Sequence, residues 1–137
     1  MKKLYLDTNI FIDILTERDE SITSFKEILP YLKHSQIYLS TLSIHITYYT
    51  LKIKQNSGLD KKVQNYIRTI NLVDLSEEIT LLAISNFTTD FEDTLQYCSA
   101  FSRNCDYILT RDPKDFSKIR KTIPSDIEII TTLEKFS

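Results

Sequence analysis

The first fifteen residues hold the feature that most restricts the fold of this chain. Residues 4–6 are a short apolar run, suited to a strand buried on both faces, and the run stops at Asp7. Two turn-forming polar residues follow, and the apolar residues between 10 and 15 then have helical spacing. The chain therefore opens with a strand, an acidic corner and a helix. Because ligands bind at the carboxyl ends of strands in open α/β sheets, Asp7 is either a helix cap or the start of a site.

Short apolar runs alternate with helical patterns along the rest of the chain. This alternation predicts an α/β fold, in which a parallel sheet with right-handed crossovers is covered by helices on both faces. We expect strands at 4–6, 37–40, 71–75, 105–109 and 127–130. We expect helices at 10–15, 21–33, 44–54, 59–70, 76–84, 90–101 and 131–136, and a turn of at most one helical turn at 113–116.

Length and charge limit the class of protein. The chain fits a single domain, residues 1–137, because no Pro-rich linker, low-complexity tract or internal repeat divides it. A net charge of −2 disfavours a module that holds nucleic acid by an overall basic field, but leaves room for an enzyme with a local basic patch. Asp7 interrupts the first apolar run too early for a signal peptide, and no stretch is long enough to span a membrane.

The two cysteines point to a reducing compartment. Cys98 and Cys105 have neither a metal-binding spacing nor the C-x-x-C spacing of a redox motif. We expect them to be reduced core residues of a cytoplasmic protein, with a disulfide as the alternative.

Three acidic corners fall at equivalent places in the predicted fold. Asp7 ends the first strand, and Asp112 ends the strand at 105–109. Asp93 lies in the first turn of the helix that precedes that strand, and such a helix begins at the carboxyl edge of the sheet. Three converging carboxylates repel one another and raise one another's pKa values, and a divalent cation removes that conflict. Oxygen-only ligands favour Mg²⁺ or Mn²⁺, ions suited to phosphodiester hydrolysis.

A structural role for the same acids is the alternative. An Asp after a strand or at a helix N-terminus usually caps the helix, and each of the three acids singly fits that role. Asp90 and Asp93 also have the spacing of an N-terminal capping arrangement. The spacing alone leaves both interpretations open, and it is the coincidence of three acids on one edge that favours a metal site.

The ordered blocks Asp7-Thr8-Asn9, Glu92-Asp93 and Thr110-Arg111-Asp112, followed by Asp115-Phe116, resemble the signature blocks of PIN-domain ribonucleases. That family includes the toxins of bacterial and archaeal VapBC-type toxin–antitoxin modules. The resemblance covers nearly the whole chain in length, block order and alternation of strands and helices. It implies a three-layer α/β/α sandwich with a central, mostly parallel five-stranded sheet, and Mg²⁺- or Mn²⁺-dependent cleavage of RNA.

The resemblance also implies roles for individual residues. Asp7, Asp93 and Asp112 match the family's metal-binding acids and are expected to be catalytic. Asp115 matches a frequent extra acid, and we expect Glu92 and Asp115 to be additional metal ligands. Substrate-binding roles are expected for three residues beside the acids, of which Arg111 can instead pair with an acid: Asn9, Thr110 and Arg111. For Asp13 we expect a salt bridge or a surface position.

The sequence departs from the family pattern at one place. The family usually has an acid in the helix after the second strand, and here no Asp or Glu occurs between Gln36 and Leu59. Our leading hypothesis is a metal-dependent endoribonuclease, the toxin of a toxin–antitoxin module. The alternative is a degenerate PIN-like domain, with weak or no nuclease activity, that binds RNA or a protein partner. A third class, an unrelated phosphate-handling enzyme such as a phosphatase, is disfavoured in its nucleotide-binding forms by the lack of a Gly-rich phosphate loop.

The expected partners follow from the resemblance. They are RNA, an antitoxin protein that covers the acidic edge, and a second copy of the chain in a homodimer. Several lysines offer a local basic face for RNA, although a solvated helix face is the alternative: Lys52, Lys54, Lys61 and Lys62.

Overall fold

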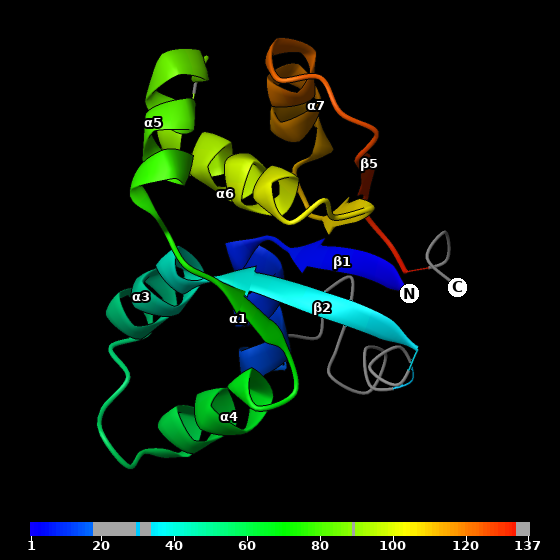
Figure 1. The fold of residues 1–137 in the computed structure, drawn as a ribbon. Helices are drawn as coiled ribbons and strands as arrows, with labels where there is room; N and C mark the ends of the chain where they lie inside the picture. Colours follow the sequence, from blue (N-terminus) through cyan, green and yellow to red (C-terminus); the bar gives the residue numbers. More distant parts are fainter. Residues whose placement is uncertain (18–29, 31–33, 89, 134–137) are drawn as a thin grey trace.

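The computed structural model of the chain describes residues 1–17, 30, 34–88 and 90–133. At its centre is a five-stranded sheet with the order β3-β2-β1-β4-β5, and every neighbouring pair of strands is parallel (Figure 1). The strands are β1 (Lys2–Leu6), β2 (Ser35–Ser40), β3 (Asn71–Val73), β4 (Tyr107–Leu109) and β5 (Glu128–Ile130). The parallel sheet predicted from the sequence is confirmed.

Helices cover both faces of this sheet. One apolar cluster packs α1 (Thr8–Thr16), α3 (Thr41–Thr50) and α4 (Gly58–Ile67) against one face. A second cluster packs the other helices against the opposite face: α5 (Glu77–Asn86), α6 (Phe91–Ser102) and α7 (Pro113–Thr122). The predicted three-layer α/β/α sandwich is therefore confirmed (Figure 1).

Strand β1 lies in the middle of the sheet, and its residues separate the two apolar clusters. Leu4 and Leu6 belong to the α1 side, whereas Tyr5 belongs to the α6 side. All three are 0–2% exposed, as expected for alternate residues of a strand buried on both faces. Such a strand cannot shift by one residue without placing its side chains on the wrong face, so the position of Asp7 at its end is strongly determined.

The strand order places the acidic corners in one crevice. The chain adds β2 and β3 on one side of β1, and later adds β4 and β5 on the other side. The order therefore reverses between β1 and β4, and at such a switch point the loops after the two strands diverge to opposite faces and leave a crevice. Asp7 follows β1 directly, and Asp112 follows β4. Helix α6 runs back against the strands, so its N-terminus lies at the same edge (Figure 1), and Asp93 belongs to its first turn.

Two predicted elements need correction. Residues 113–122 form a helix of 10 residues, where the sequence predicted at most one turn at 113–116. Pro113 starts α7, and Phe116 and Ile119 are its only buried residues. The four Lys and Arg residues of this helix hid so narrow an apolar stripe in the sequence. Residues 131–133, at the start of the predicted closing helix, are not helical. The expected helix at 21–33 lies, apart from Pro30, outside the described residues.

Other expectations concern the cysteines and the membrane. Cys98 and Cys105 are buried free thiols, so the prediction of reduced core cysteines is confirmed and the disulfide is not formed. Among the described residues, no helix combines the length and the apolar character that crossing a bilayer requires.

Candidate functional site

Asp7 is held rigidly at the carboxyl end of β1. It is the N-cap of α1, where its Oδ1 accepts a hydrogen bond of 2.8 Å from the backbone N–H of Thr8. Its Oδ2 accepts a second bond of 2.8 Å from the hydroxyl of Thr110. The side chain is only 5% exposed, and burial raises the pKa of its carboxyl, although both hydrogen bonds act in the opposite direction. Asp7 is therefore both a cap and an oriented carboxylate.

The hydroxyl of Thr110 joins the corners after β1 and β4. It donates to Asp7 and also accepts a 3.0 Å hydrogen bond from the backbone N–H of Asp112. Thr110 itself is completely buried, and its own N–H donates to Ile130 of β5. One threonine thus fixes the relative position of two of the predicted catalytic acids.

Asp93 lies in the first turn of α6, beside these corners. Asp90 caps this helix by accepting a 3.0 Å bond from the N–H of Asp93, so the predicted capping arrangement is confirmed. The side chain of Asp93 does not make this cap and is available to the site. Burial, followed by the charge of Asp7, raises the pKa of Asp93 to about 7. The carboxylate form of Asp93 is therefore disfavoured at this edge while no cation compensates it.

Asp93 converges with two acids from the loop after β4 and the start of α7. One carboxylate oxygen from each of Asp93, Asp112 and Asp115 lies within 4.8 Å of the others. A hydrogen bond with Asp115 is the main cause of a raised pKa of Asp112. Three close oxygen donors fit a hard divalent cation, which would favour the carboxylate forms of Asp93 and Asp112, whose pKa values are raised. The cluster thus joins two of the predicted main ligands, Asp93 and Asp112, with Asp115, which was predicted only as an additional ligand.

Asp7 and Glu92 lie beside this cluster and are not part of the three-residue group. Asp7 still raises the pKa of Asp93 and of Glu92 by its charge, which places all three in one electrostatic environment. Burial is the main cause of the raised pKa of Glu92, although its side chain reaches solvent. The structure therefore gathers acids from three separate segments, as the sequence predicted, with Asp115 closer to the centre than expected.

The predicted substrate-binding residues occupy different positions. Asn9 is exposed in the first turn of α1, whereas Thr110 is buried and bonds Asp7. The Nε of Arg111 lies 3.3 Å from Oδ2 of Asp13, whose side chain is 1% exposed. The ion-pair alternative for Arg111 and the salt bridge for Asp13 are therefore both confirmed. The Arg111 side chain is nevertheless 39% exposed, and its charge acts on Asp7.

Helix α3, the helix after the second strand, presents hydroxyl groups where the resemblance predicted an acid. Ser43 and Thr47 are completely buried, whereas His45 on the same helix is exposed. Ser43 Oγ lies 2.7 Å from the Thr8 hydroxyl, directly beside Asp7 in the sequence. Sequence reasoning missed this contact and its main partner, Gln96. No local sequence pattern marks Gln96, because its burial among residues 94–100 of α6 appears only in the folded structure.

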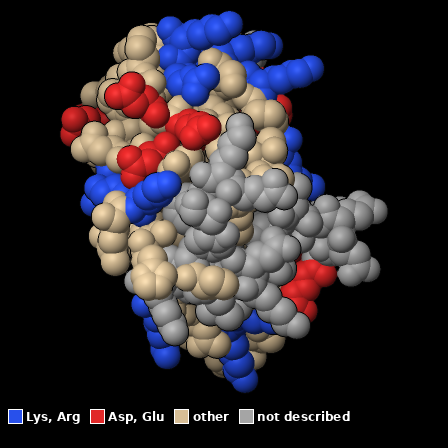
Figure 2. Space-filling model, turned by 90° about the vertical axis from the view of Figure 1, so that its right-hand side faces the viewer, with Lys and Arg blue, Asp and Glu red and all other residues tan. Residues whose placement is uncertain are grey.

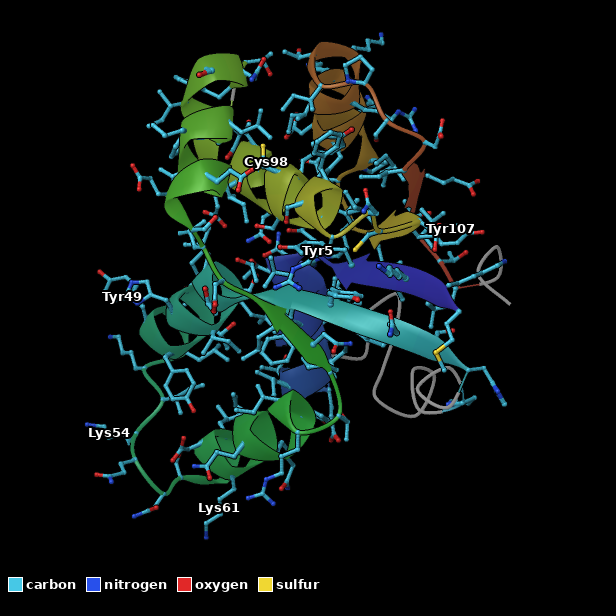
Figure 3. All side chains as sticks on the ribbon, in the orientation of Figure 1. Tyr5, Tyr49, Lys54, Lys61, Cys98 and Tyr107 are labelled. Carbon is cyan, nitrogen blue, oxygen red and sulfur yellow. The ribbon has the colours of Figure 1, made fainter. Side chains whose placement is uncertain are left out.

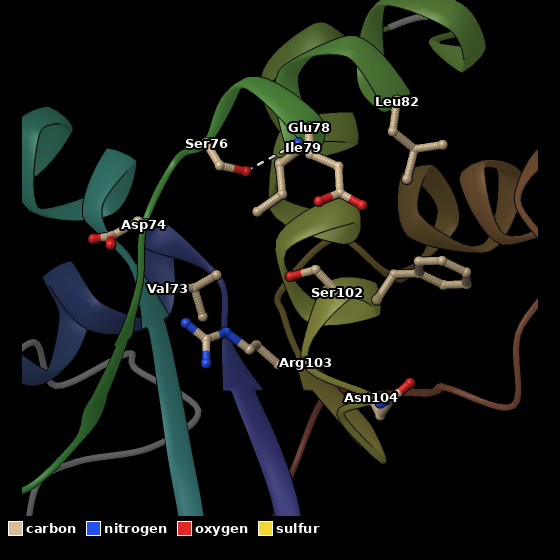
Figure 4. Close-up of a pocket in the computed structure, with 10 residues that line it drawn as sticks. Val73, Asp74, Ser76, Glu78, Ile79, Leu82, Ser102, Arg103 and Asn104 are labelled. Atoms are coloured by element: carbon tan, nitrogen blue, oxygen red, sulfur yellow. Dashed lines mark hydrogen bonds between the residues drawn. The ribbon is translucent and has the colours of Figure 1, made fainter.

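A cavity of about 550 Å³, lined in part by Asp74 and Glu78, lies apart from the cluster of Asp93, Asp112 and Asp115 (Figure 4). It opens between the start of α5 and the C-terminal end of α6, where Ser102 and Arg103 line it. Asp93 lies near the opposite end of that helix, and ten residues of α-helix span about 15 Å. This cavity is therefore separate from the acidic cluster.

Basic side chains gather on two surfaces. Figure 2 shows Lys and Arg residues at the top of the molecule, where Figure 1 places α7. Helix α7 starts at the acidic cluster and carries Lys114, Lys118 and Lys121 at helical spacing on its exposed side. The second surface includes Lys54 and Lys61, which extend from the α3–α4 loop and from α4 (Figure 3).

Comparison with known proteins supplies the family. The sequence profile of the PIN domain matches residues 3–114, which include β1, α6 and the corner after β4. The chain belongs to the PIN-domain family. This PIN domain is 31% identical to Ribonuclease VapC1 of Aquifex aeolicus (strain VF5) over 140 residues, which cover 97% of this chain and 92% of that protein.

Solved structures share the same fold. The PIN domain superposes on a chain of VapBC2 from Rickettsia felis, crystallised with a DNA fragment of its promoter, with a TM-score of 0.69 and 17% identity. This match covers 93% of the present chain and 97% of the other. The PIN domain is also similar to VapC20 of Mycobacterium tuberculosis, described as a sarcin–ricin loop cleaving toxin, with a TM-score of 0.65 and 12% identity. This second match covers 84% of the present chain and 93% of VapC20.

Proposed function

We propose that this PIN domain is a divalent-metal-dependent endoribonuclease that hydrolyses RNA phosphodiester bonds as the toxin of a toxin–antitoxin module. The convergence of Asp93, Asp112 and Asp115 within 4.8 Å, beside the doubly hydrogen-bonded Asp7, is the observation that carries the proposal. Membership of the PIN-domain family and similarity to a ribonuclease over nearly the whole chain support it.

In this proposal Asp7, Asp93 and Asp112 form the catalytic centre, with Asp115 and Glu92 as further ligands. The cluster would hold Mg²⁺ or Mn²⁺, which lowers the pKa of a water molecule and neutralises charge on a phosphate. Two hydrogen bonds fix the orientation of Asp7, so its charge faces the site without rearrangement when substrate binds.

The proposed substrate contacts surround the acids. Asn9 and Arg111 are exposed at the same edge, so they can reach an RNA strand, and Arg111 offers a cation for a phosphate. The buried Thr110 would act on substrate through Asp7 and Asp112, the two acids that it joins. The exposed lysines of α7 extend the positive surface away from the cluster.

Replacement of Asp7 by Asn tests the proposal. Asn keeps the shape of the side chain and a carbonyl oxygen for the cap, so Asp7→Asn should fold normally and lose Mg²⁺- or Mn²⁺-dependent cleavage of single-stranded RNA. The exposed Asp74, after β3, provides a matched control, and Asp74→Asn should cleave like the parent. Equal cleavage by Asp7→Asn and the parent, with the same metal requirement, would refute the proposed catalytic centre.

A second candidate function rests on the composition of α3. That helix offers the site Ser43 in place of a carboxylate, which favours a PIN domain that binds metal weakly and acts by binding RNA or a protein. Titration calorimetry separates the two candidates. Heat of Mn²⁺ binding at millimolar metal supports the nuclease, whereas retained RNA binding without any Mn²⁺ heat supports the binding protein.

The proposal includes protein partners. Several of the structural relatives are toxin–antitoxin complexes, which supports an antitoxin for this PIN domain. We also propose a homodimer, because Leu81 and Ile84 of α5, and Phe87 directly after this helix, are apolar side chains that are each more than half exposed. The free thiols of Cys98 and Cys105 are consistent with a cytoplasmic location.

A further inference from the structure

Gln96 of α6 is completely buried, and both ends of its amide are hydrogen-bonded. Its Oε1 accepts a hydrogen bond from the hydroxyl of Tyr5. Its Nε2 donates to the hydroxyl of Thr8 at 2.8 Å and to that of Ser43 at 3.1 Å. The hydroxyls of Thr8 and Ser43 lie 2.7 Å apart, so the four side chains form one buried network, in which only Thr8 has any exposed surface, at 3%.

The network joins four elements from both sides of the sheet. Tyr5 extends from β1 toward α6 (Figure 3), while Thr8 starts α1 and Ser43 lies in the first turn of α3. Helix α6 covers one face of the sheet, whereas α1 and α3 cover the other. The Gln96 amide therefore passes over the carboxyl edge and ties the two helical layers together.

Two of the proposed catalytic acids are attached to this network. Thr8 follows Asp7, and its backbone N–H donates to Asp7 Oδ1. Asp93 lies three residues before Gln96, one turn earlier in α6, so the two side chains share one side of the helix. The Gln96 amide thus connects the segment that carries Asp7 with the segment that carries Asp93, and these acids come from opposite faces of the sheet.

We propose that Gln96 is a positioning residue for the acidic site, which sets the separation of Asp7 and Asp93 through its bonds to Thr8, Ser43 and Tyr5. This inference rests on the proposed function, because the acids are taken to bind a cation. A network that only stabilised the core would affect unfolding and leave cation affinity unchanged. A network that sets the separation of the acids affects both.

Gln96→Met tests the inference, because methionine keeps the length and volume of the side chain but lacks the amide. Loss of a residue that orients metal ligands typically lowers metal affinity 10–100-fold, so we expect the Mn²⁺ dissociation constant to rise by about tenfold. Titration calorimetry measures this without RNA. The KM for RNA should change less than the Mn²⁺ concentration required for half-maximal cleavage.

Tyr97→Phe is the matched control. Tyr97 is the next residue of α6, but its hydroxyl does not belong to the Gln96 network. It is hydrogen-bonded to Ile123 O and to Ser125 Oγ, both at 2.6 Å, at the C-terminal end of α7. Its loss should also lower the unfolding temperature but should leave the Mn²⁺ affinity at the parent value. Equal Mn²⁺ affinity of Gln96→Met, Tyr97→Phe and the parent would overturn the inference.

A second pair of variants covers the case in which Gln96→Met does not fold. Thr8→Val removes the network hydroxyl and keeps the backbone N–H to Asp7, whereas Thr8→Ser keeps both. Weaker Mn²⁺ binding by Thr8→Val, with binding by Thr8→Ser close to the parent, supports the inference, and identical binding by the two contradicts it. A parent that binds Mn²⁺ without cleaving RNA contradicts only the proposed function, whereas a parent that binds no Mn²⁺ contradicts both.

Discussion

Replacement of Asp93 by Asn should stabilise the metal-free protein at alkaline pH. Burial and the neighbouring acids raise the pKa of Asp93 from an ordinary 3.8 to about 7, so the folded protein holds the Asp93 proton more tightly than the unfolded chain does. Stability from this group is then fully present below about pH 4 and is lost as the pH rises through 7. The Asp93→Asn variant carries no charge at this position, so its folding stability does not fall for this reason as the pH rises through 7.

The size of the effect follows from the pKa. A rise from 3.8 to about 7 corresponds to at most about 4 kcal/mol, at about 1.4 kcal/mol per pKa unit. Asp93 is only partly buried, so solvent screening reduces this value substantially. The N-terminus of α6 also favours a negative charge by about 0.3–1 kcal/mol, and the neutral amide of the variant loses this contribution. We therefore expect Asp93→Asn to be about 1–2 kcal/mol more stable than the parent at pH 8 and nearly equal to it at pH 4.

Urea unfolding in EDTA, followed by circular dichroism between pH 4 and pH 8, measures this difference. Glu78→Gln is the control, because Glu78 occupies the first turn of α5 and is exposed. It should be equal to the parent or slightly less stable at every pH. The reasoning is refuted if Asp93→Asn is no more stable than the parent at pH 8, or if its gain is the same at pH 4 and pH 8.

Four further predictions test other parts of the structure. Mn²⁺ should raise the melting temperature of the parent more at pH 8 than at pH 5, because protons compete for the raised-pKa carboxylates, and should raise that of Asp93→Asn much less. Phe116→Ala should cost about 3–5 kcal/mol in urea unfolding, because this ring is completely buried under α7. In an Asp7→Asn background, replacing the three exposed lysines of α7 by Gln should weaken the salt dependence of single-stranded RNA binding. The slope of log affinity against log salt should fall by about 2, because each phosphate contact contributes about 0.7. The same replacement at Lys52, Lys54 and Lys61 should leave this slope unchanged. Leu81→Glu with Ile84→Glu should convert a dimer to a monomer in light scattering, and an unchanged mass would contradict a dimer formed through α5.

Local patterns carried much of the prediction. Short apolar runs located all five strands to within a few residues. The signal is strongest for β1 and β2, whose consecutive buried residues face both layers of helices, whereas β3 and β5 are partly exposed. The caps of α5 and α6 were also predictable, since Ser76 and Asp90 bond amides within their own helices. Helix α7 was predicted too short because its apolar stripe has only a few members among many charged residues.

The composition of the site depended on contacts between distant segments. The sequence predicted that acids after β1, after β4 and at the start of α6 would meet, because parallel strands with helical crossovers place these points on one edge. The sequence could not show that Asp115, and not Asp7, completes the group with Asp93 and Asp112. That outcome depends on how α7 packs, which brings the three carboxylate oxygens within 4.8 Å of one another. Nor could the sequence show that Thr110 joins two of the acids.

The sequence by itself determined the strand, the acidic corner and the helix at the start of the chain, since these depend on neighbouring residues only. The tertiary structure alone decided that Thr8, Ser43 and Gln96 meet, because they are separated by 35 to 88 residues along the chain. A buried glutamine has no local pattern, and its role follows from the partners that its amide finds. In this PIN domain those partners lie beside Asp7, at the corner with which the chain begins.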